Sequence, residues 1–418
     1  MNLTKVTGKL KEQIAIFSGK LSCGLPKTAR RFVEEALYGI QSRQSVRLSE
    51  IGRSLNESIP LIKTINRLSF QLSREGLWQK VTAALLRLAA PSVGRDTLLV
   101  LDLSDINKPY AKSMEYLDRV RDGSAGELVD GYWTAQVIAA EVDKSEVIPL
   151  YGRLYSIKAP DCTGENQEIF KAVTSVSRAV GHRGTWVIDR GGDRRILFDY
   201  LLTNHKRFII RLTGNRTLIH KGEKVIALPL ASMCSLPHRE IMVREEEKSE
   251  KIYRIRFGFC RVYLPDLPLP LSLVVVAGFG QKPMMLLTNL PLKKDGKVIM
   301  NVIKSYLTRW RIEETIRFIK QSYELEDIRV QTYARLQNMM VLVFAAAYFA
   351  AVYIGSKLKM KVLSAVIIKL SQRIFGVADF RYYAIADGIK RLLGRDGKGL
   401  WRPTTPWTPK NQLNLLPP

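Results

Sequence analysis

The sequence predicts an α/β domain with a central sheet, a strand-rich insertion within it and helical regions at both ends. Three observations predict this class. Apolar residues recur at helical spacing from residue 10 to 88 and again from 297 to about 393. Between 97 and 212, short apolar runs typical of buried strands alternate with helical segments. Between 213 and 295, strand patterns follow one another with only turn residues between them.

The composition is that of an ordinary globular chain with an unusual charge. The 418 residues are 46% hydrophobic and 25% charged, which excludes disordered, collagenous and disulfide-stapled classes. Lys and Arg number 65 against 39 Asp and Glu, so the net charge is +26 and the pI about 9.9. Residues 1–90 hold 15 cations and 6 acids, and residues 331–418 hold 13 and 3. This balance favours a polyanion as partner, either nucleic acid or an anionic membrane surface.

The cysteines and the first residues favour a cytoplasmic protein. No two cysteines form a C-x-x-C pair, which argues against a zinc module or a disulfide framework and for a reduced compartment. The opening segment MNLTKVTGKLKEQIAIFSGK has no apolar core of signal-peptide length. The four cysteines are Cys23, Cys162, Cys234 and Cys260.

One stretch is long enough to cross a membrane. Residues 336–356, LQNMMVLVFAAAYFAAVYIGS, carry no charge over 21 positions. Gln337, Asn338 and five alanines fit a helix packed between protein neighbours better than a lone span in lipid. We therefore expect a buried helix and no membrane partner, with a membrane span as the alternative.

The N-terminal region reads as a set of helices that could contact DNA. The segment LSEIGRSLNESIPLIKTINRLS indicates two short helices joined at Asn56–Ser58, as in a helix-turn-helix, and a generic helical bundle is the alternative. A boundary follows at residues 90–94. Six cations in or beside this segment could meet phosphates: Arg43, Arg47, Arg53, Lys63, Arg67 and Arg74.

The next elements predict the sheet. The run TLLVLDLS reads as a buried strand ending in Asp102, and residues 131–156 read as a hairpin that turns at Asp143–Ser145. A helix near 167–180 precedes a second buried strand, TWVIDR, which ends in Asp189. A helix to about Leu202 and the strand RFIIRL complete this part.

The insertion and the tail follow. In KIYRIRFGFCRVY, alternate residues from Tyr253 to Phe259 share one strand face, and LSLVVVAGFG and MMLLTNLPL read as further strands. After the helical region, the tail WRPTTPWTPKNQLNLLPP is expected to dock as an extended segment. Trp401 and Trp407 would anchor it, although stacking on an exposed base is the alternative.

Two carboxylates stand at equivalent places in the predicted sheet. Asp102 and Asp189 each end an apolar strand, where open α/β sheets place ligands. Either one alone is more often a helix cap or a turn residue. Two of them on adjacent strands repel each other unless a hard divalent cation lies between them.

A stripe of ionisable side chains is the third candidate feature. In YLTRWRIEETIRFIK, five residues fall at offsets 0, 3, 7, 11 and 14 and so share one face of a single helix: Tyr306, Arg309, Glu313, Arg317 and Lys320. Apolar residues flank the stripe on both sides. A solvated face with intrahelical ion pairs is the simpler interpretation. We favour a carboxylate metal ligand whose cationic neighbours hold phosphate.

These features together resemble a known family. The strand-end Asp102, Asp189 within D-R-x-x-D, and the spacing Y-(2)-R-(3)-E-(6)-K are similar to bacterial insertion-sequence DDE transposases of the IS-four type, which include the Tn-five transposase. The similarity runs from about Thr97 to Val343 and includes GYW at 131–133. The resemblance implies a ribonuclease-H-like catalytic domain with a β-stranded insertion, between helical regions.

The resemblance also implies a mechanism and site residues. Asp102, Asp189 and Glu313 would be catalytic and would hold two Mg²⁺ ions, for which Mn²⁺ can substitute, to activate a water or 3′-hydroxyl and stabilise the leaving oxygen. Tyr306, Arg309 and Lys320 would contact DNA. The role of Asp105 is left open.

The partners implied are double-stranded DNA, as transposon ends with terminal inverted repeats and as target, and a second copy of the chain in the DNA complex. Residues 1–90 would bind the ends, 91–212 and 296–330 would form the catalytic domain around the insertion 213–295, and 331–418 would dimerise and contact DNA. We expect a bacterial cytoplasmic, nucleoid-associated enzyme.

Two other functions compete with this one. A DNA-binding regulator would explain the charge but not three carboxylates. A divalent-metal-dependent nuclease or resolvase without strand transfer would share the triad, and the stripe and the bulky insertion count against it. Arg194 and Arg195 would either bind DNA or be solvated. The four histidines, at 182, 205, 220 and 238, show no zinc-binding spacing.

Overall fold

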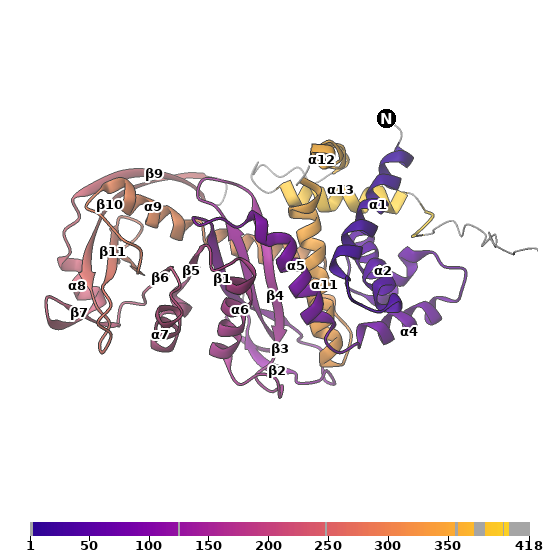
Figure 1. Ribbon diagram of the computed structural model, residues 1–418, viewed down its shortest axis with the longest axis horizontal. Helices are drawn as coiled ribbons and strands as arrows, with labels where there is room; N and C mark the ends of the chain where they lie inside the picture. Colours follow the sequence, from indigo (N-terminus) through magenta and orange to yellow (C-terminus); the bar gives the residue numbers. More distant parts are fainter. Residues whose placement is uncertain are drawn as a thin grey trace, which may run out of the picture.

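The computed structural model describes residues 3–123, 126–246, 249–355, 358–371, 381–395 and 397–400. A ten-stranded mixed sheet runs through the middle of the molecule in the order β2-β3-β1-β5-β6-β12-β11-β10-β9, and β4 also pairs with β3, on the edge away from β1. Helices of the two chain ends gather at one end of this sheet (Figure 1). The mixed α/β class predicted from the sequence is confirmed.

The N-terminal region is helical throughout, as predicted. Its helices are α1 (Leu3–Leu21), α2 (Lys27–Arg43), α3 (Leu48–Leu55), α4 (Leu61–Leu72) and α5 (Leu77–Ala89), followed by the 3₁₀ turn η1 (Ala90–Ser92). Helix α3 ends because Asn56 adopts a left-handed backbone with φ of 51°. The two short helices expected around Asn56 are therefore present, and α2 packs against both of them.

The first half of the sheet follows the predicted order of strands and helices. It contains β1 (Leu98–Asn107), β2 (Asp118–Arg121), β3 (Leu128–Ala140), β4 (Val147–Tyr155), α6 (Glu165–Ala179), β5 (Thr185–Ile188), the 3₁₀ turn η2 (Arg190–Gly192), α7 (Arg195–Thr203) and β6 (Phe208–Arg211). Strands β1, β5 and β6 are parallel, and β3 and β4 form the expected hairpin.

One prediction about β1 is wrong: the strand does not end at Asp102. It continues to Asn107 because its antiparallel partner β3 stays paired with it as far as Gly131, whereas its parallel partner β5 stops at Ile188. Gly131 allows this close pairing, since a Cβ there would lie 2.3 Å from the carbonyl oxygen of Ile106.

The strands of residues 213–295 extend the same sheet. A small separate pair, β7 (Thr217–His220) and β8 (Glu223–Ile226), precedes α8 (Ala227–Met233), and then come β9 (His238–Glu246), β10 (Ser249–Val262), β11 (Leu271–Ala277) and β12 (Met284–Thr288). Strand β12 pairs antiparallel with β6, so the insertion joins the sheet by hydrogen bonds. Ile255 and Phe257 on β10 are buried, as the alternation predicts.

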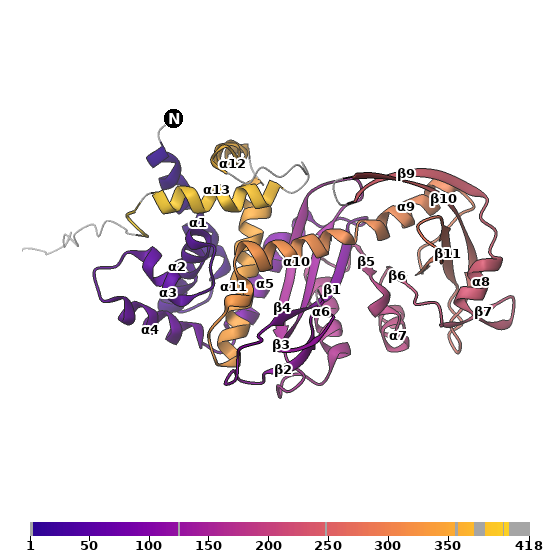
Figure 2. The same ribbon diagram turned by 180° about the vertical axis from the view of Figure 1, so that it is seen from behind.

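The C-terminal region is helical, with α9 (Gly296–Leu307), α10 (Trp310–Ser322), η3 (Leu325–Asp327), α11 (Tyr333–Ala351), η4 (Tyr353–Gly355), α12 (Leu358–Leu370) and α13 (Arg381–Arg395). The tail with Trp401 and Trp407 lies outside the described residues. Figure 2 shows α10 running across the sheet between α9 and α11.

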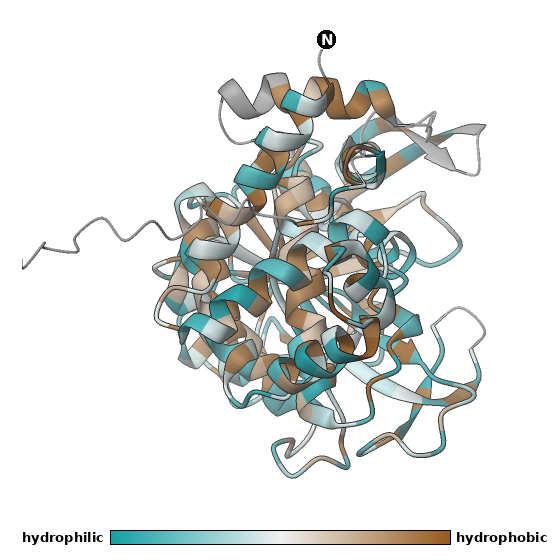
Figure 3. Cartoon of the chain, turned by 90° about the vertical axis from the view of Figure 1, so that its right-hand side faces the viewer, coloured by the Kyte–Doolittle hydropathy of each residue, from teal (hydrophilic) through white to brown (hydrophobic). Residues whose placement is uncertain are grey.

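Helix α11 lies between the sheet and the N-terminal helices (Figure 1). It contains the uncharged stretch, is long and apolar enough to cross a membrane, and is the one helix of that kind in the described part of the chain. Its residues from Leu336 to Ala350 are all buried, against β4, α2 and α5. Two aromatic contacts, Phe17 with Tyr348 and with Phe349, attach α1 to it. Figure 3, which looks at this end, shows hydrophobic and hydrophilic residues alternating along the helices. The buried-helix interpretation is the one that the packing supports.

Candidate active site

The strand register brings Asp102 and Asp189 together. Leu101 of β1 pairs with Ile188 of β5, and paired strands lie about 4.8 Å apart. Asp102 and Asp189 each follow directly after this pair. The Asp189 carboxylate caps η2 by accepting a hydrogen bond from the Gly191 N–H at 2.8 Å. Asp102 accepts one from the Leu103 N–H at 3.0 Å. The adjacency expected from the two apolar strands is present.

Glu313 reaches the same place from α10, which packs on β1. Its side chain is 53% exposed and its Oε1 accepts a hydrogen bond from Arg309 Nη2 at 2.6 Å. Arg309 Nη1 also lies 3.7 Å from Asp102 Oδ2. One guanidinium therefore connects Glu313 to Asp102.

The pKa of Asp102 reflects burial and several neighbouring charges. Burial raises the pKa of this carboxyl, and the negative charges of Asp189 and Glu313 raise it further. The positive charge of Arg309 opposes them, and the resulting pKa of Asp102 is about 7. Burial alone would lower the pKa of Arg309, but Tyr306, Glu313 and Asp102 outweigh it and raise the pKa. The site is short of positive charge.

This shortage bears on metal binding. Among the described residues, no three His, Cys, Asp or Glu side chains come close enough together to enclose a metal ion. Glu313 is instead hydrogen-bonded to Arg309. The donor set still fits a hard divalent cation, because it offers only carboxylate oxygens and because the mutual repulsion that raises the pKa of Asp102 would be relieved by a cation. Glu313 would have to leave Arg309 to join it.

The expected single helical stripe is wrong, because the helix is interrupted. Helix α9 ends at Leu307, the Arg309 N–H bonds to the Tyr306 carbonyl at 3.0 Å in a tight turn, and α10 starts at Trp310. Thr308 helps to end α9, since its hydroxyl donates to the Lys304 carbonyl at 2.9 Å. Tyr306 thus lies on a different helix from Glu313.

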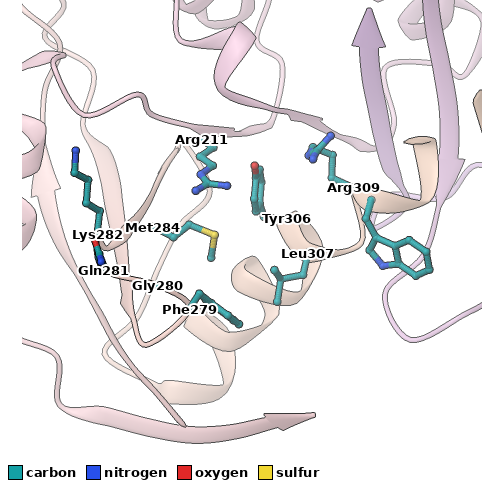
Figure 4. Close-up of a pocket in the computed structure, with 10 residues that line it drawn as sticks. Arg211, Phe279, Gly280, Gln281, Lys282, Met284, Tyr306, Leu307 and Arg309 are labelled. Atoms are coloured by element: carbon teal, nitrogen blue, oxygen red, sulfur yellow. The ribbon is translucent and has the colours of Figure 1, made fainter. Parts of the chain in front are cut away.

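A cavity lies beside the interruption, and Arg309, which contacts Asp102 and Glu313, lines it. The cavity measures about 230 Å³, and Figure 4 shows Tyr306 between Arg211 and Arg309 along its wall. Lys282 enters from the turn between β11 and β12, and Phe279 and Trp310 add aromatic surface. Sequence reasoning missed Arg211 and Lys282. Arg211 ends β6, the strand next to β5, so its position at the end of a predicted strand could have identified it. No pattern in the sequence indicates Lys282.

Lys320 lies elsewhere. Seven residues separate it from Glu313, about 10 Å along the helix. Its ammonium is 3.4 Å from Asp105 and 3.2 Å from Glu326. Asp105 is buried and also accepts from the Gly123 N–H at 3.4 Å. Nearby Lys108, which the sequence did not single out, donates to the Ile328 carbonyl at 2.8 Å, and burial lowers its pKa to about 8.

Other cations singled out in the sequence have protein partners. Arg194 pairs with Glu165, and Arg195 with Asp199 at 2.8 Å. In the N-terminal helices, Arg47 pairs with Asp327, Arg53 with Glu50, and Arg67 with Glu35 and Glu57. Arg74 lies within 3.4 Å of the Gln71 side chain, and Arg43 and Lys63 are exposed. Arg317 pairs with Glu314.

The histidines take no part in the site. His182 contacts Lys206, His220 bonds to the Arg261 carbonyl at 2.9 Å, and His238 stacks on Phe257.

Comparison with known proteins adds a family. Residues 159–349, a little under half of the chain, match the family described as the transposase DDE domain. The match contains Asp189 and Glu313 and begins after Asp102. It supports a DDE transposase.

Among solved structures, the chain is similar to the piggyBac transposase in a synaptic complex with hairpin DNA, solved by cryo-electron microscopy. The identity is 12%, the TM-score 0.46, and the alignment covers 95% of this chain and 84% of that one. No curated protein matches the chain.

Proposed function

We propose that the chain is a DNA transposase of the IS-four type that binds the terminal inverted repeats of its own element, cleaves them and joins them to target DNA. The proposal is supported by two observations: Asp102 and Asp189 follow paired residues of the neighbouring strands β1 and β5, and Arg309 contacts both Asp102 and Glu313 while it also lines a cation-rich cavity. The match of residues 159–349 to a transposase family supports it.

The carboxylates would hold divalent metal, with Mg²⁺ as the physiological ion. Bound there, the metal supplies an activated water or 3′-hydroxyl and stabilises the leaving oxygen of an in-line phosphodiester displacement. Asp102 must be ionised to bind the metal. It therefore has to lose a proton that burial and the neighbouring negative charges help it to keep. Glu313 must part from Arg309.

The cations would hold the DNA. Once released from Glu313, Arg309 can direct its planar guanidinium at a phosphate and donate two parallel hydrogen bonds to it. Arg211, Tyr306 and Lys282 line the adjoining cavity, where they can bind and orient the strand next to the carboxylates. Lys320 is 21% exposed and pairs with Asp105 and Glu326, so its ammonium would contact a phosphate while it still pairs with these two carboxylates. The ribonuclease-H-like fold, a homodimer in the DNA complex and a cytoplasmic location belong to the same proposal.

The test uses the DNA that flanks the gene. A plasmid carrying that flanking DNA on both sides of a marker is incubated with the purified chain, MgCl₂ and a target plasmid, and the products are sequenced. The proposal expects excised ends joined to target, no product from Asp102→Ala, and full activity from the exposed control Glu223→Ala. Cleavage without joining would favour a nuclease or resolvase, and no cleavage at all would refute both.

A further inference from the structure

Helix α4 presents an unusual outer face. Ile62, Asn66 and Phe70 fall four residues apart and so form one stripe along it. Ile62 is 60% exposed and Phe70 is 70% exposed, and Asn66 and Lys63 are exposed too. Ile59, just before the helix, is 44% exposed. Bulky apolar side chains gathered on one exposed helix face mark an interaction surface.

The opposite face of α4 is fixed to the protein. Thr64, Leu68 and Leu72 are buried against α2, α3 and α11. Helix α3 approaches closely at Gly52, where a Cβ would lie 3.1 Å from a Leu61 methyl group. Helix α4 cannot rotate to bury its apolar stripe, because the face with Thr64, Leu68 and Leu72 is already packed against the neighbouring helices.

A buried charge network also holds the orientation of α4. Glu35 of α2, which is almost fully buried, accepts from Arg31 at 2.6 Å and from Arg67 of α4. Glu57, in the turn before α4, accepts from Arg67 at 2.7 Å and from the Thr64 hydroxyl at 2.8 Å. The network fixes α2, the turn and α4 together, so the exposed stripe is pre-organised before any partner arrives.

We propose that this face of α4 enters the major groove of duplex DNA and reads bases, with Ile62 and Phe70 against thymine methyl groups and Asn66 on adenine. The proposal rests on the proposed function and names the element that recognises the transposon ends. A helix of 12 residues is about 18 Å long and fits the groove. Asn pairs its amide with the N6 and N7 edge of adenine, and apolar side chains contact the thymine methyl.

The charge around the stripe favours DNA over a protein surface. Residues 1–90 hold 15 cations and 6 acids, a net charge of +9. Lys63 is exposed on α4 itself. Arg31 and Arg53 lie at the neighbouring ends of α2 and α3 and are 60% and 52% exposed, although both also pair with glutamates of the protein. Helix α4 lies at the outer edge of the helical body in both views, clear of the sheet (Figures 1 and 2). A duplex can therefore reach it while phosphates meet these cations.

The first experiment finds the sequence that the full-length chain prefers. Duplexes with a randomised centre are bound to the chain, and the retained fraction is sequenced. An enriched motif with A·T pairs is expected. Affinity is then measured by fluorescence anisotropy for the parent chain, Ile62→Ala, Asn66→Ala, Phe70→Ala and the control Ile16→Ala, which alters a 41% exposed isoleucine on α1.

The second experiment isolates single contacts. Deoxyuridine in place of thymine removes only the methyl group. Each such change at a contacted thymine should weaken the parent about 3- to 5-fold, and Ile62→Ala or Phe70→Ala should lose no further affinity at its own base. Binding to random duplex and the affinity of Ile16→Ala should stay within about twofold.

The outcomes separate this inference from the proposed function. If the parent enriches a motif that all three α4 variants still prefer equally, the inference is overturned and the transposase proposal stands. If Phe70→Ala changes the sedimentation of the chain and leaves its DNA motif unchanged, the face binds protein and the inference also fails. If the parent binds no duplex, both proposals fail.

Discussion

Binding of a divalent cation at Asp102 should strengthen about tenfold between pH 6 and pH 8. Burial and the charges of Asp189 and Glu313 raise the pKa of Asp102 to about 7. The ionised fraction of this carboxyl therefore rises from about 0.1 at pH 6 to about 0.9 at pH 8. Only the ionised form is a ligand, so the apparent affinity follows that fraction and falls as the pH falls.

The assay is calorimetric titration of the metal-free chain with MnCl₂ at several pH values, without DNA. At pH 7 about half the sites lose a proton on binding, so the measured heat should depend on the ionisation enthalpy of the buffer, equivalent to about 0.5 proton released. Asp102→Asn, which cannot ionise, should bind weakly at every pH and release no proton there. Equal affinity of the parent chain at pH 6 and pH 8, without proton release, would refute this account of the site.

The same pKa shift makes the stability of the metal-free chain fall as the pH rises, whereas metal binding strengthens. Folded Asp102 keeps its proton up to about pH 7, whereas the unfolded chain loses it near the ordinary value of 3.8. The folded state binds more protons between these values, so the free energy of unfolding in a chelator should fall as the pH rises through this window, by at most about 4 kcal/mol. The difference in free energy of unfolding from Asp102→Asn should become independent of pH below about pH 3, and thermal melts of the two chains measure it.

Three further predictions concern the other side chains of the site. Asp189→Ala and Glu313→Ala should abolish strand cleavage and change end-DNA affinity less than about twofold, since cations carry binding; a large loss of binding would mean that these residues shape the DNA surface. Arg309→Lys should lower cleavage of intact and pre-nicked ends about a hundredfold, because an ammonium cannot hold a phosphate by two parallel bonds; parental rates on both substrates would leave Arg309 as an ion-pair residue only. Lys320→Ala should lower the free energy of unfolding by about 1 to 3 kcal/mol, because buried Asp105 loses its cation, and adding Asp105→Asn should recover most of that loss. If the double variant recovers stability but not cleavage in a nicked-end assay, Lys320 acts on DNA as well.

The strands that carry the aspartates were predictable because burial on both faces demands continuous apolar runs. Both TLLVL and TWVI meet that demand and form β1 and β5. The end of β1 was not predictable from its own residues. It depends on how far β3 stays paired, and Asp105 and Asn107 are polar residues kept in the strand by that partner.

The break between α9 and α10 leaves no local signal. No glycine or proline lies between residues 297 and 322, so helical spacing continues without interruption in the sequence. The break is a tertiary effect, in which Tyr306 is buried along a cavity wall while Glu313 points to solvent. Ion pairs such as Arg47 with Asp327 join residues 280 positions apart, and a local pattern cannot distinguish such a cation from one that waits for a phosphate.

The charges of the site also order its events. Asp102 is influenced by the charges of Asp189, Glu313 and Arg309, and with all four groups ionised this set carries a net charge of −2. A phosphate brought there first would add to that repulsion, and Arg309 could bind it only by leaving Glu313 unpaired. A divalent cation held by the aspartates would offset the excess negative charge, and Glu313 could then leave Arg309, which would be free to bind the phosphate. Cation binding should therefore precede or accompany the entry of the scissile phosphate, while recognition by the distant face of α4 needs no metal at all.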